Sequence, residues 1–337
     1  MKYSEAKQIL ARAAAQFIPE QEAQYFATEI VEAHVRKSPR SDVIDEALGD
    51  IESWVRPHGE WQRTVDLPGY FVCDGCGLGP LLKIKSIHDE LASKAHANGL
   101  AMMSIRNAKA FHTLHVWVQG LANRGYFALA AYNGGPDGVI PLNGTVGILG
   151  TNPIAFGFPG DKGSICIDMA TSEIPYFHVL DAKKRGAALP QNSAVDSSGE
   201  LTTDATTAVD DAGVSNLTPM GNTYKGYNLN YVLEIMTSAL IGAKISAQQD
   251  PSYLPEEHGG FIIAIDIERI SGREQFDQAV RMQNDEIRAQ KPRAGVQKVL
   301  VPGDTNLARV ANASEVTELL LSEETLAKLQ ALKSGTA

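Results

Sequence analysis

Helical and strand-type segments alternate through the first part of the chain, and this order restricts the fold more than any other feature. Residues 81–99 carry apolar side chains at helical spacing, and residues 100–105 form a short apolar run typical of a strand. A second helical segment at 111–123 precedes a second strand-type run at 126–132. Because such units bury their apolar faces by layering helices on a sheet, the pattern predicts an α/β fold.

The segments on either side of this core are predicted to be mainly helical. Amphipathic stretches occur before it and after it, separated by Pro, Gly and charged residues. We expect the N-terminal helices to pack with the C-terminal helix. The expected helices cover residues 4–17, 20–35, 43–55, 227–242, 273–291 and 315–332.

Charge and composition exclude several classes of function. The 337 residues carry a formal net charge of −10, which disfavours binding to nucleic acid or to an anionic membrane. The sequence has no run of about 18 apolar residues that could span a membrane. Its N-terminus lacks the apolar stretch of a secretory signal. Three cysteines cannot build a disulfide framework, so we expect a cytoplasmic protein with reduced thiols.

One CxxC pair, Cys73 and Cys76, raises the question of a metal site. A zinc site would need a second pair, and Cys166 is alone and distant in sequence. The pair also flanks an Asp-Gly turn, so packing around that turn is sufficient to explain it. We therefore expect no bound metal.

The stretch Gly150–Ser172 is predicted to form a hairpin that ends in polar residues. Apolar runs precede and follow a turn at residues 161–163, and the second run ends near Asp168. A carboxylate there needs a partner, and the hydroxyls of Thr171 and Ser172 follow it, which suits a strand end that meets a polar ligand. A second interpretation stays open, in which Asp168 only caps its own turn.

Three motifs resemble those of a known family. GTNPIAFGFP at 150–159, IDMATS at 167–172 and YKGYNL at 224–229 resemble the non-Rossmann malate/L-lactate dehydrogenase family. Among its members, the chain most resembles the piperideine-2-carboxylate/pyrroline-2-carboxylate reductases and ureidoglycolate dehydrogenase. The absence of a GxGxxG motif after a strand agrees with a fold that lacks a Rossmann domain.

The resemblance implies a fold, a domain order and a cofactor. The fold would be α/β, sulfolactate dehydrogenase-like, with helical packing of the two chain ends. Residues 1–64 would pack with 287–337, residues 65–120 would connect, and residues 121–286 would bind NADPH or NADH. The family also implies a homodimer and a small-molecule substrate.

The same resemblance implies a set of cofactor contacts. Lys225 stands just before a long helix, where backbone N–H groups and a Lys can bind an anion; a solvated Lys is the other interpretation. Asp304 stands where relatives often carry Glu. The implied contacts are Asn133, Gly134, Thr151, Asn152, Pro153, Asp168, Met169, Ala170, Thr171, Ser172, Lys225, Gly226, Gly303 and Asp304.

The catalytic motif is where this chain departs from the family. The family's Ser-His-Gly-x-x-Arg aligns with residues 45–50, so Asp45 and Glu46 replace Ser-His and Asp50 replaces Arg. A second family histidine aligns with Ala110, close to His112. We expect Glu46, His112 and Asp168 to be catalytic, and Asp45, Asp50 and His115 to bind substrate. The other interpretation is a solvated acidic helix face and two structural histidines.

These observations predict an NAD(P)H-dependent reductase of an imine or a ketone. Glu46 and Asp50 are four residues apart on a predicted helix and would line one wall, so like-charge repulsion would disfavour a small carboxylate. A neutral or amine-bearing substrate is expected instead. The alternatives are a homologue that binds the cofactor without hydride transfer, and a lyase or isomerase.

Overall fold

A mixed sheet forms the centre of the protein. The structure is a computed structural model that describes residues 1–36, 42–56, 58–135, 138–209, 213–249, 257–312 and 318–334. Within these ranges, seven strands lie in the order β1-β2-β3-β9-β4-β5-β6. Only β2 and β3 pair in parallel among them. The strands are β1 Gln62–Asp66, β2 Tyr70–Asp74, β3 Leu100–Ala108, β4 Tyr126–Tyr132, β5 Ile154–Phe158, β6 Ile165–Met169 and β9 His258–Asp266.

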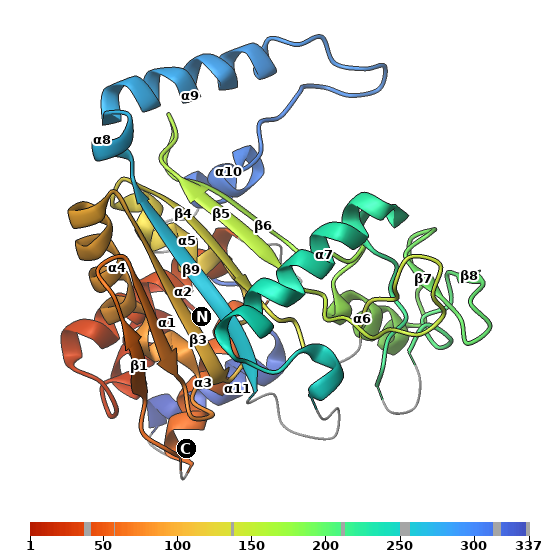
Figure 1. The fold of residues 1–337 in the computed structure, drawn as a ribbon, viewed down its shortest axis with the longest axis horizontal. Helices are drawn as coiled ribbons and strands as arrows, with labels where there is room; N and C mark the ends of the chain where they lie inside the picture. Colours follow the sequence, from red (N-terminus) through yellow and green to blue (C-terminus); the bar gives the residue numbers. More distant parts are fainter. Residues whose placement is uncertain are drawn as a thin grey trace.

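Strand β9 lies between β3 and β4, although it comes more than a hundred residues after both (Figure 1). Its side chains alternate between two cores, as the period of a strand requires. Ile262 and Ala264 belong to the main cluster, whereas Phe261 and Ile263 face a smaller one on the opposite side. The side chains of the central strand therefore pack into the hydrophobic clusters on both faces of the sheet.

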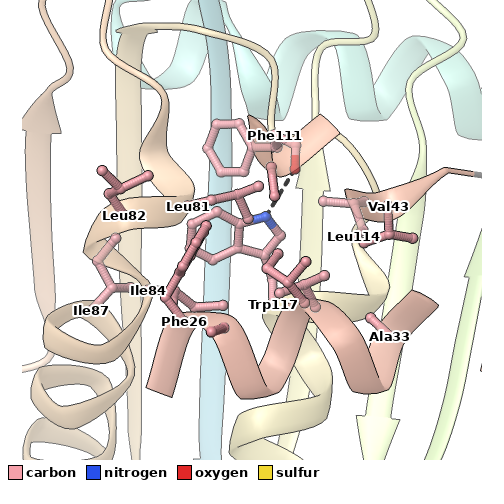
Figure 2. Close-up of a cluster of buried hydrophobic side chains, with 14 of the residues drawn as sticks. Phe26, Ala33, Val43, Leu81, Leu82, Ile84, Ile87, Phe111, Leu114 and Trp117 are labelled. Carbon is pink, nitrogen blue, oxygen red and sulfur yellow. Dashed lines mark hydrogen bonds between the residues drawn. The ribbon is translucent and has the colours of Figure 1, made fainter. Parts of the chain in front are cut away.

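Helices cover both faces. On one face α4 (Ile84–Asn98) and α5 (His115–Asn123) pack on the sheet, and α2 (Glu20–Arg36) packs over them. Figure 2 shows the junction, where Trp117 lies among Phe26, Leu81 and Phe111 and donates its indole N–H to the Phe111 carbonyl at 3.0 Å. On the other face α7 (Tyr224–Thr237) packs on β4 and β9.

The chain ends lie together. Helix α11 (Glu323–Ser334) contacts α1 (Tyr3–Ala14) and α3 (Val43–Val55). The remaining elements are α6 Tyr176–Arg185, α8 Ile267–Ile270, α9 Arg273–Arg288, α10 Asp304–Asn312, η1 Pro80–Lys83, η2 Met220–Asn222, η3 Ala239–Ile241, η4 Ser246–Gln248 and the ribbon β7 Ala194–Val195 with β8 Leu201–Thr202.

The predicted α/β layering is confirmed, and α3 and β4 have the predicted bounds. The helix predicted at 111–123 is wrong at its start, because α5 begins at His115. His112 lies before the helix with φ +57°, so His112 and His115 do not share a helix face.

Among the other helix predictions, the largest differences are at the ends of two. α7 stops at Thr237, because Ser238 leaves helical geometry with φ −129° and ψ −83°. The helix predicted at 315–332 begins only at residue 323, because Ser322 Oγ accepts from the Thr325 backbone N–H at 3.1 Å and caps it there. Residues 315–317 of that prediction lie outside the described residues.

The predicted three-part domain division stays a prediction. Its boundaries at 64/65, 120/121 and 286/287 fall inside β1, α5 and α9. Strands from the predicted connecting unit and from the predicted cofactor unit pair directly through β9 in one sheet.

Candidate active site

A cavity of about 500 Å³ lies where the ends of β4, β5 and β6 meet the N-terminal ends of α5 and α6. This volume is in the range of small-molecule sites, about 300–1,000 Å³. Helix α3 and helix α10 close its other sides. The lining residues are Glu46, His112, Thr113, His115, Tyr132, Gly134, Thr151, Pro153, Asp168, Met169, Ala170, Pro175, Tyr176, Phe177, His178, Asn306 and Arg309.

Asp168 joins the sheet to helix α5 at the cavity. It is the penultimate residue of β6, and its Oδ2 accepts from Thr113 Oγ1 at 3.1 Å and from the His115 backbone N–H at 3.0 Å. Leu114 at the N-cap offers no side-chain acceptor, so the carboxylate satisfies a free N–H of the first turn. Asp168 thus caps a helix distant in sequence rather than its own turn, and it lines the cavity.

His112 is held by a buried carboxylate. Its Nε2–H donates to Asp50 Oδ1 at 2.8 Å, and Asp50 Oδ2 accepts from the Leu81 backbone N–H at 3.0 Å. Burial alone would lower the pKa of His112, but the charges of Asp50 and Glu46 outweigh burial and raise that pKa above its ordinary value. The left-handed backbone at His112 costs energy that these contacts offset.

Of the three acidic residues that replace the family motif, only Glu46 lines the cavity. Its Oε2 accepts from the Thr113 backbone N–H at 3.1 Å. Asp50 is fully buried behind His112, and Asp45 points to the chain end, where it pairs with Lys328 at 2.8 Å. The structure therefore does not bring Asp45 and Asp50 to the substrate wall on which the expected repulsion depended.

His115, the third residue expected to bind substrate, lines the cavity but is almost completely buried. Its Nε2–H donates to Gln119 Oε1 at 3.2 Å, and the Gln119 amide in turn donates to Glu29 at 2.9 Å. Burial raises the pKa of Glu29 to about 7. This chain of buried hydrogen bonds from Glu29 through Gln119 fixes the orientation of the His115 ring.

The residues predicted to contact the cofactor divide into three groups. Gly134, Thr151, Pro153, Asp168, Met169 and Ala170 line the cavity. The side chains of Asn133, Asn152, Thr171 and Ser172 are buried behind it and bond inside the protein. The centre of that network is Glu234, which accepts from Asn133 at 3.0 Å and from Asn152 at 2.7 Å.

Four more predicted cofactor residues do not line the cavity: Lys225, Gly226, Gly303 and Asp304. Lys225 is exposed on the first turn of α7. Gly226 packs so closely that an added Cβ would lie 2.0 Å from the Met220 carbonyl oxygen. Asp304 pairs with Arg288 at 2.7 Å, and this pairing lowers the pKa of the carboxyl.

The structure adds residues that the sequence did not single out, among them Thr113, Tyr132, Asn306 and Arg309. Thr113 adjoins His112, so proximity could have suggested it. Nothing in the sequence pattern placed α10, and hence Arg309, beside the strand ends.

The cavity walls fit a nicotinamide nucleotide. Helix α6 begins at the cavity with Pro175 as its N-cap and no side-chain cap, so the positive end of its dipole lies at the cavity, where it would attract an anion such as a phosphate. Gly134 and Ala170 present little side-chain bulk, and Thr151 adds a hydroxyl. Among the described residues no group of three or more metal-ligating side chains occurs, and no helix is long and apolar enough to cross a membrane.

Comparison with known proteins identifies the family of this chain. The sequence model of the malate/L-lactate dehydrogenase family matches residues 1–330. The chain belongs to this family. Its members are NAD(P)-dependent dehydrogenases and reductases.

Individual relatives support the assignment. The chain is 30% identical to L-sulfolactate dehydrogenase of Methanocaldococcus jannaschii over 85% of this chain and 83% of that protein. It is 32% identical to a Δ1-pyrroline-2-carboxylate/Δ1-piperideine-2-carboxylate reductase of Pseudomonas putida over 68% and 67%. Malate dehydrogenase from Entamoeba histolytica, 20% identical, shares the fold with a TM-score of 0.86 over 100% of this chain and 97% of that one. The predicted family and its sulfolactate dehydrogenase-like fold are thus confirmed.

Proposed function

We propose that this protein reduces a C=N or C=O bond with NADPH or NADH, and that His112 donates the proton. The observation that carries the proposal is the pair of His112 with buried Asp50 at the edge of the cavity. The nicotinamide, when bound, supplies the hydride. Family membership supports the class of reaction, and the pair supports the source of the proton.

The hydrogen bond to Asp50 determines which proton moves. Asp50 engages Nε2–H, so the transferable proton of the imidazolium is the one on Nδ1. The charges of Asp50 and Glu46 raise the pKa of His112 and so favour its protonated form, and loss of the Nδ1 proton leaves the neutral ring still bonded to Asp50. Asp50 acts through His112 and is a positioning residue.

Two carboxylates favour an amine-bearing group at the reacting end of the substrate. Glu46 and Asp168 both line the cavity, and a protonated imine would be attracted to them. Asp168 is also anchored to α5, so its position is fixed before substrate binds. We therefore place an imine ahead of a ketone as the natural substrate.

The outer face of α7 supports a homodimer. On α7, Tyr231 and Val232 are about half exposed (51% and 50%) and Tyr224 is more exposed (58%), and Leu240 in the following η3 is 63% exposed. These exposed apolar side chains belong to the helix that packs on β4 and β9 (Figure 1) and to the turn after it. We place the working enzyme in the cytoplasm, where reduced nicotinamide cofactors and free thiols such as Cys73 and Cys166 coexist.

The test is hydride consumption. The purified protein is supplied with NADH or NADPH and a panel of cyclic imines, amino ketones and 2-oxo acids, and absorbance at 340 nm is followed. We expect turnover, and we expect His112→Asn to lower kcat by about 100-fold. His58→Gln, which changes an exposed histidine outside the cavity, is the matched control.

Two results would contradict the proposal. One is a protein that binds NADPH tightly but oxidises it with no member of the panel, which would favour the cofactor-binding homologue. The other is a His112→Asn variant with unchanged kcat and unchanged pH dependence, which would move the proton donor elsewhere.

A further inference from the structure

Among the described residues that line the cavity, Arg309 is the one Lys or Arg side chain. It lies on α10, in the same wall as Asn306, which is one turn earlier and also lines the cavity. The carboxylates Glu46 and Asp168 line the same cavity from α3 and from the end of β6. The described lining of the cavity therefore carries acidic groups together with a cationic group.

Neutral oxygens hold Arg309 in place. Its Nη1 donates to the Arg36 backbone carbonyl at 3.0 Å and to Asn306 Oδ1 at 3.4 Å. In the described ranges no carboxylate forms an ion pair with it, so these contacts orient the guanidinium without neutralising it. The start of its helix is fixed in turn, because Asp304 pairs with Arg288 at 2.7 Å.

Arg309 could supply the cation that this chain lacks at the position of the family's motif arginine. The family arginine aligns with Asp50, and in the structure Asp50 is buried and serves His112. If the ligand carries an anionic group, the cation that binds it would have to come from an element other than α3. Arg309 offers a planar fork that suits a carboxylate, and a bidentate pair would use the nitrogens that its present contacts leave.

We propose that Arg309, assisted by Asn306, binds the carboxylate of the substrate, while Glu46 and Asp168 face its imine or amine end. The inference rests on the proposed function and narrows its substrate to a compound that carries both an anionic and a cationic group. It reverses the expectation that small carboxylates are excluded, because only one of the two carboxylates of α3 that were expected there lines the cavity.

The experiment measures binding rather than turnover. The probe is oxamate, a small carboxylate, titrated by calorimetry into the protein saturated with NADH or NADPH. We expect Arg309→Gln to weaken oxamate about 10- to 100-fold, the range for a lost charge-assisted hydrogen bond. Arg309→Lys should recover part of the loss. The neutral ester methyl oxamate should bind equally to the native protein and to Arg309→Gln.

Controls separate this role from folding and from cofactor binding. Arg281→Gln removes an exposed arginine of α9 outside the cavity and should leave oxamate binding unchanged. Thermal melting of Arg309→Gln shows whether α10 still packs. The affinity for NADH and NADPH should change by less than about twofold, since the inferred partner is the substrate.

Three outcomes overturn the inference: no oxamate binding to the native protein, equal oxamate affinity in Arg309→Gln, or a loss confined to nucleotide affinity. These outcomes differ from failure of the proposed function. A protein that binds oxamate through Arg309 yet never oxidises NADPH keeps the inference and refutes the reductase. An active reductase whose Arg309→Gln variant binds oxamate as tightly as the native protein keeps the proposed function and refutes the inference.

Discussion

The two long walls of the cavity are built in different ways. The strand wall, from Gly134 to Ala170 along β4, β5 and β6, rests on a buried polar network centred on Glu234. The helix wall, formed by α3 and the segment before α5, rests on single contacts such as His112 with Asp50. The difference teaches that the strand wall is held by an interlinked network, whereas the chemistry of the helix wall can change by exchange of a few side chains.

The largest effect on this difference is expected from removing Glu234, the centre of the network behind the strand wall. Glu234 is buried and accepts from Asn133, Asn152 and Ser246. Glu234→Ala would remove the acceptor that these three buried donors share, so we expect a loss of about 3–5 kcal/mol in the free energy of unfolding. Urea unfolding measures it, with Glu274→Ala on exposed α9 as the control. A loss below about 1 kcal/mol would show that the network does not support the wall.

The helix wall should respond in chemistry rather than in fold. Asp50→Asn removes the charge that raises the pKa of His112, so the fall in reductase activity with rising pH should begin at a lower pH. We expect the activity deficit of the variant relative to the native enzyme to grow as pH rises above the ordinary histidine pKa of about 6.5. The pH profile of kcat measures the shift, and an unmoved profile would contradict the pairing.

The same pair predicts a pH dependence of stability. The folded-state pKa of His112 is raised, so its pairing stabilises the protein fully below the unfolded value of about 6.5. This contribution disappears as pH rises through the folded-state value. In Asp50→Asn this part of the dependence should vanish, as unfolding at a series of pH values would show.

A smaller effect is expected where the two walls meet. Thr113 Oγ1 donates to Asp168 at 3.1 Å, and Thr113→Val keeps the shape while removing that donor. We expect a loss of about 1 kcal/mol in stability, the usual net value of one hydrogen bond. The His115 N–H still holds Asp168, so the helix cap should persist. Thr113→Ser, which keeps the hydroxyl, is the matched control, and equal losses in both variants would refute the role of the hydroxyl.

The smallest effect is expected at Asp45. It pairs with Lys328 in a partly exposed contact, so Asp45→Asn should cost less than about 1 kcal/mol. KM and kcat should stay unchanged, because Asp45 lies outside the cavity. A clear rise in KM would restore the sequence-based hypothesis that Asp45 binds substrate.

Much of the fold could be predicted because local patterns determine it. Helix α3 and strand β4 follow from periodicity, and Asp168 follows from a polar residue at the end of an apolar run. The start of α5 could not be predicted, because its cap comes from Asp168, 53 residues away. The burial of Asp50 and the placement of Arg309 likewise depend on contacts between distant segments, which no window of sequence contains.

The central position of β9 has a consequence for biosynthesis. During translation β3 and β4 emerge long before residues 258–266, so each would present an unpaired edge in the nascent chain. The sheet can close only after about three quarters of the polypeptide has been made, and pairing across such separations is slow. Release from the ribosome before residue 258 would yield an aggregation-prone fragment rather than a smaller stable protein, and a chaperone that shields those edges would raise the yield of native enzyme.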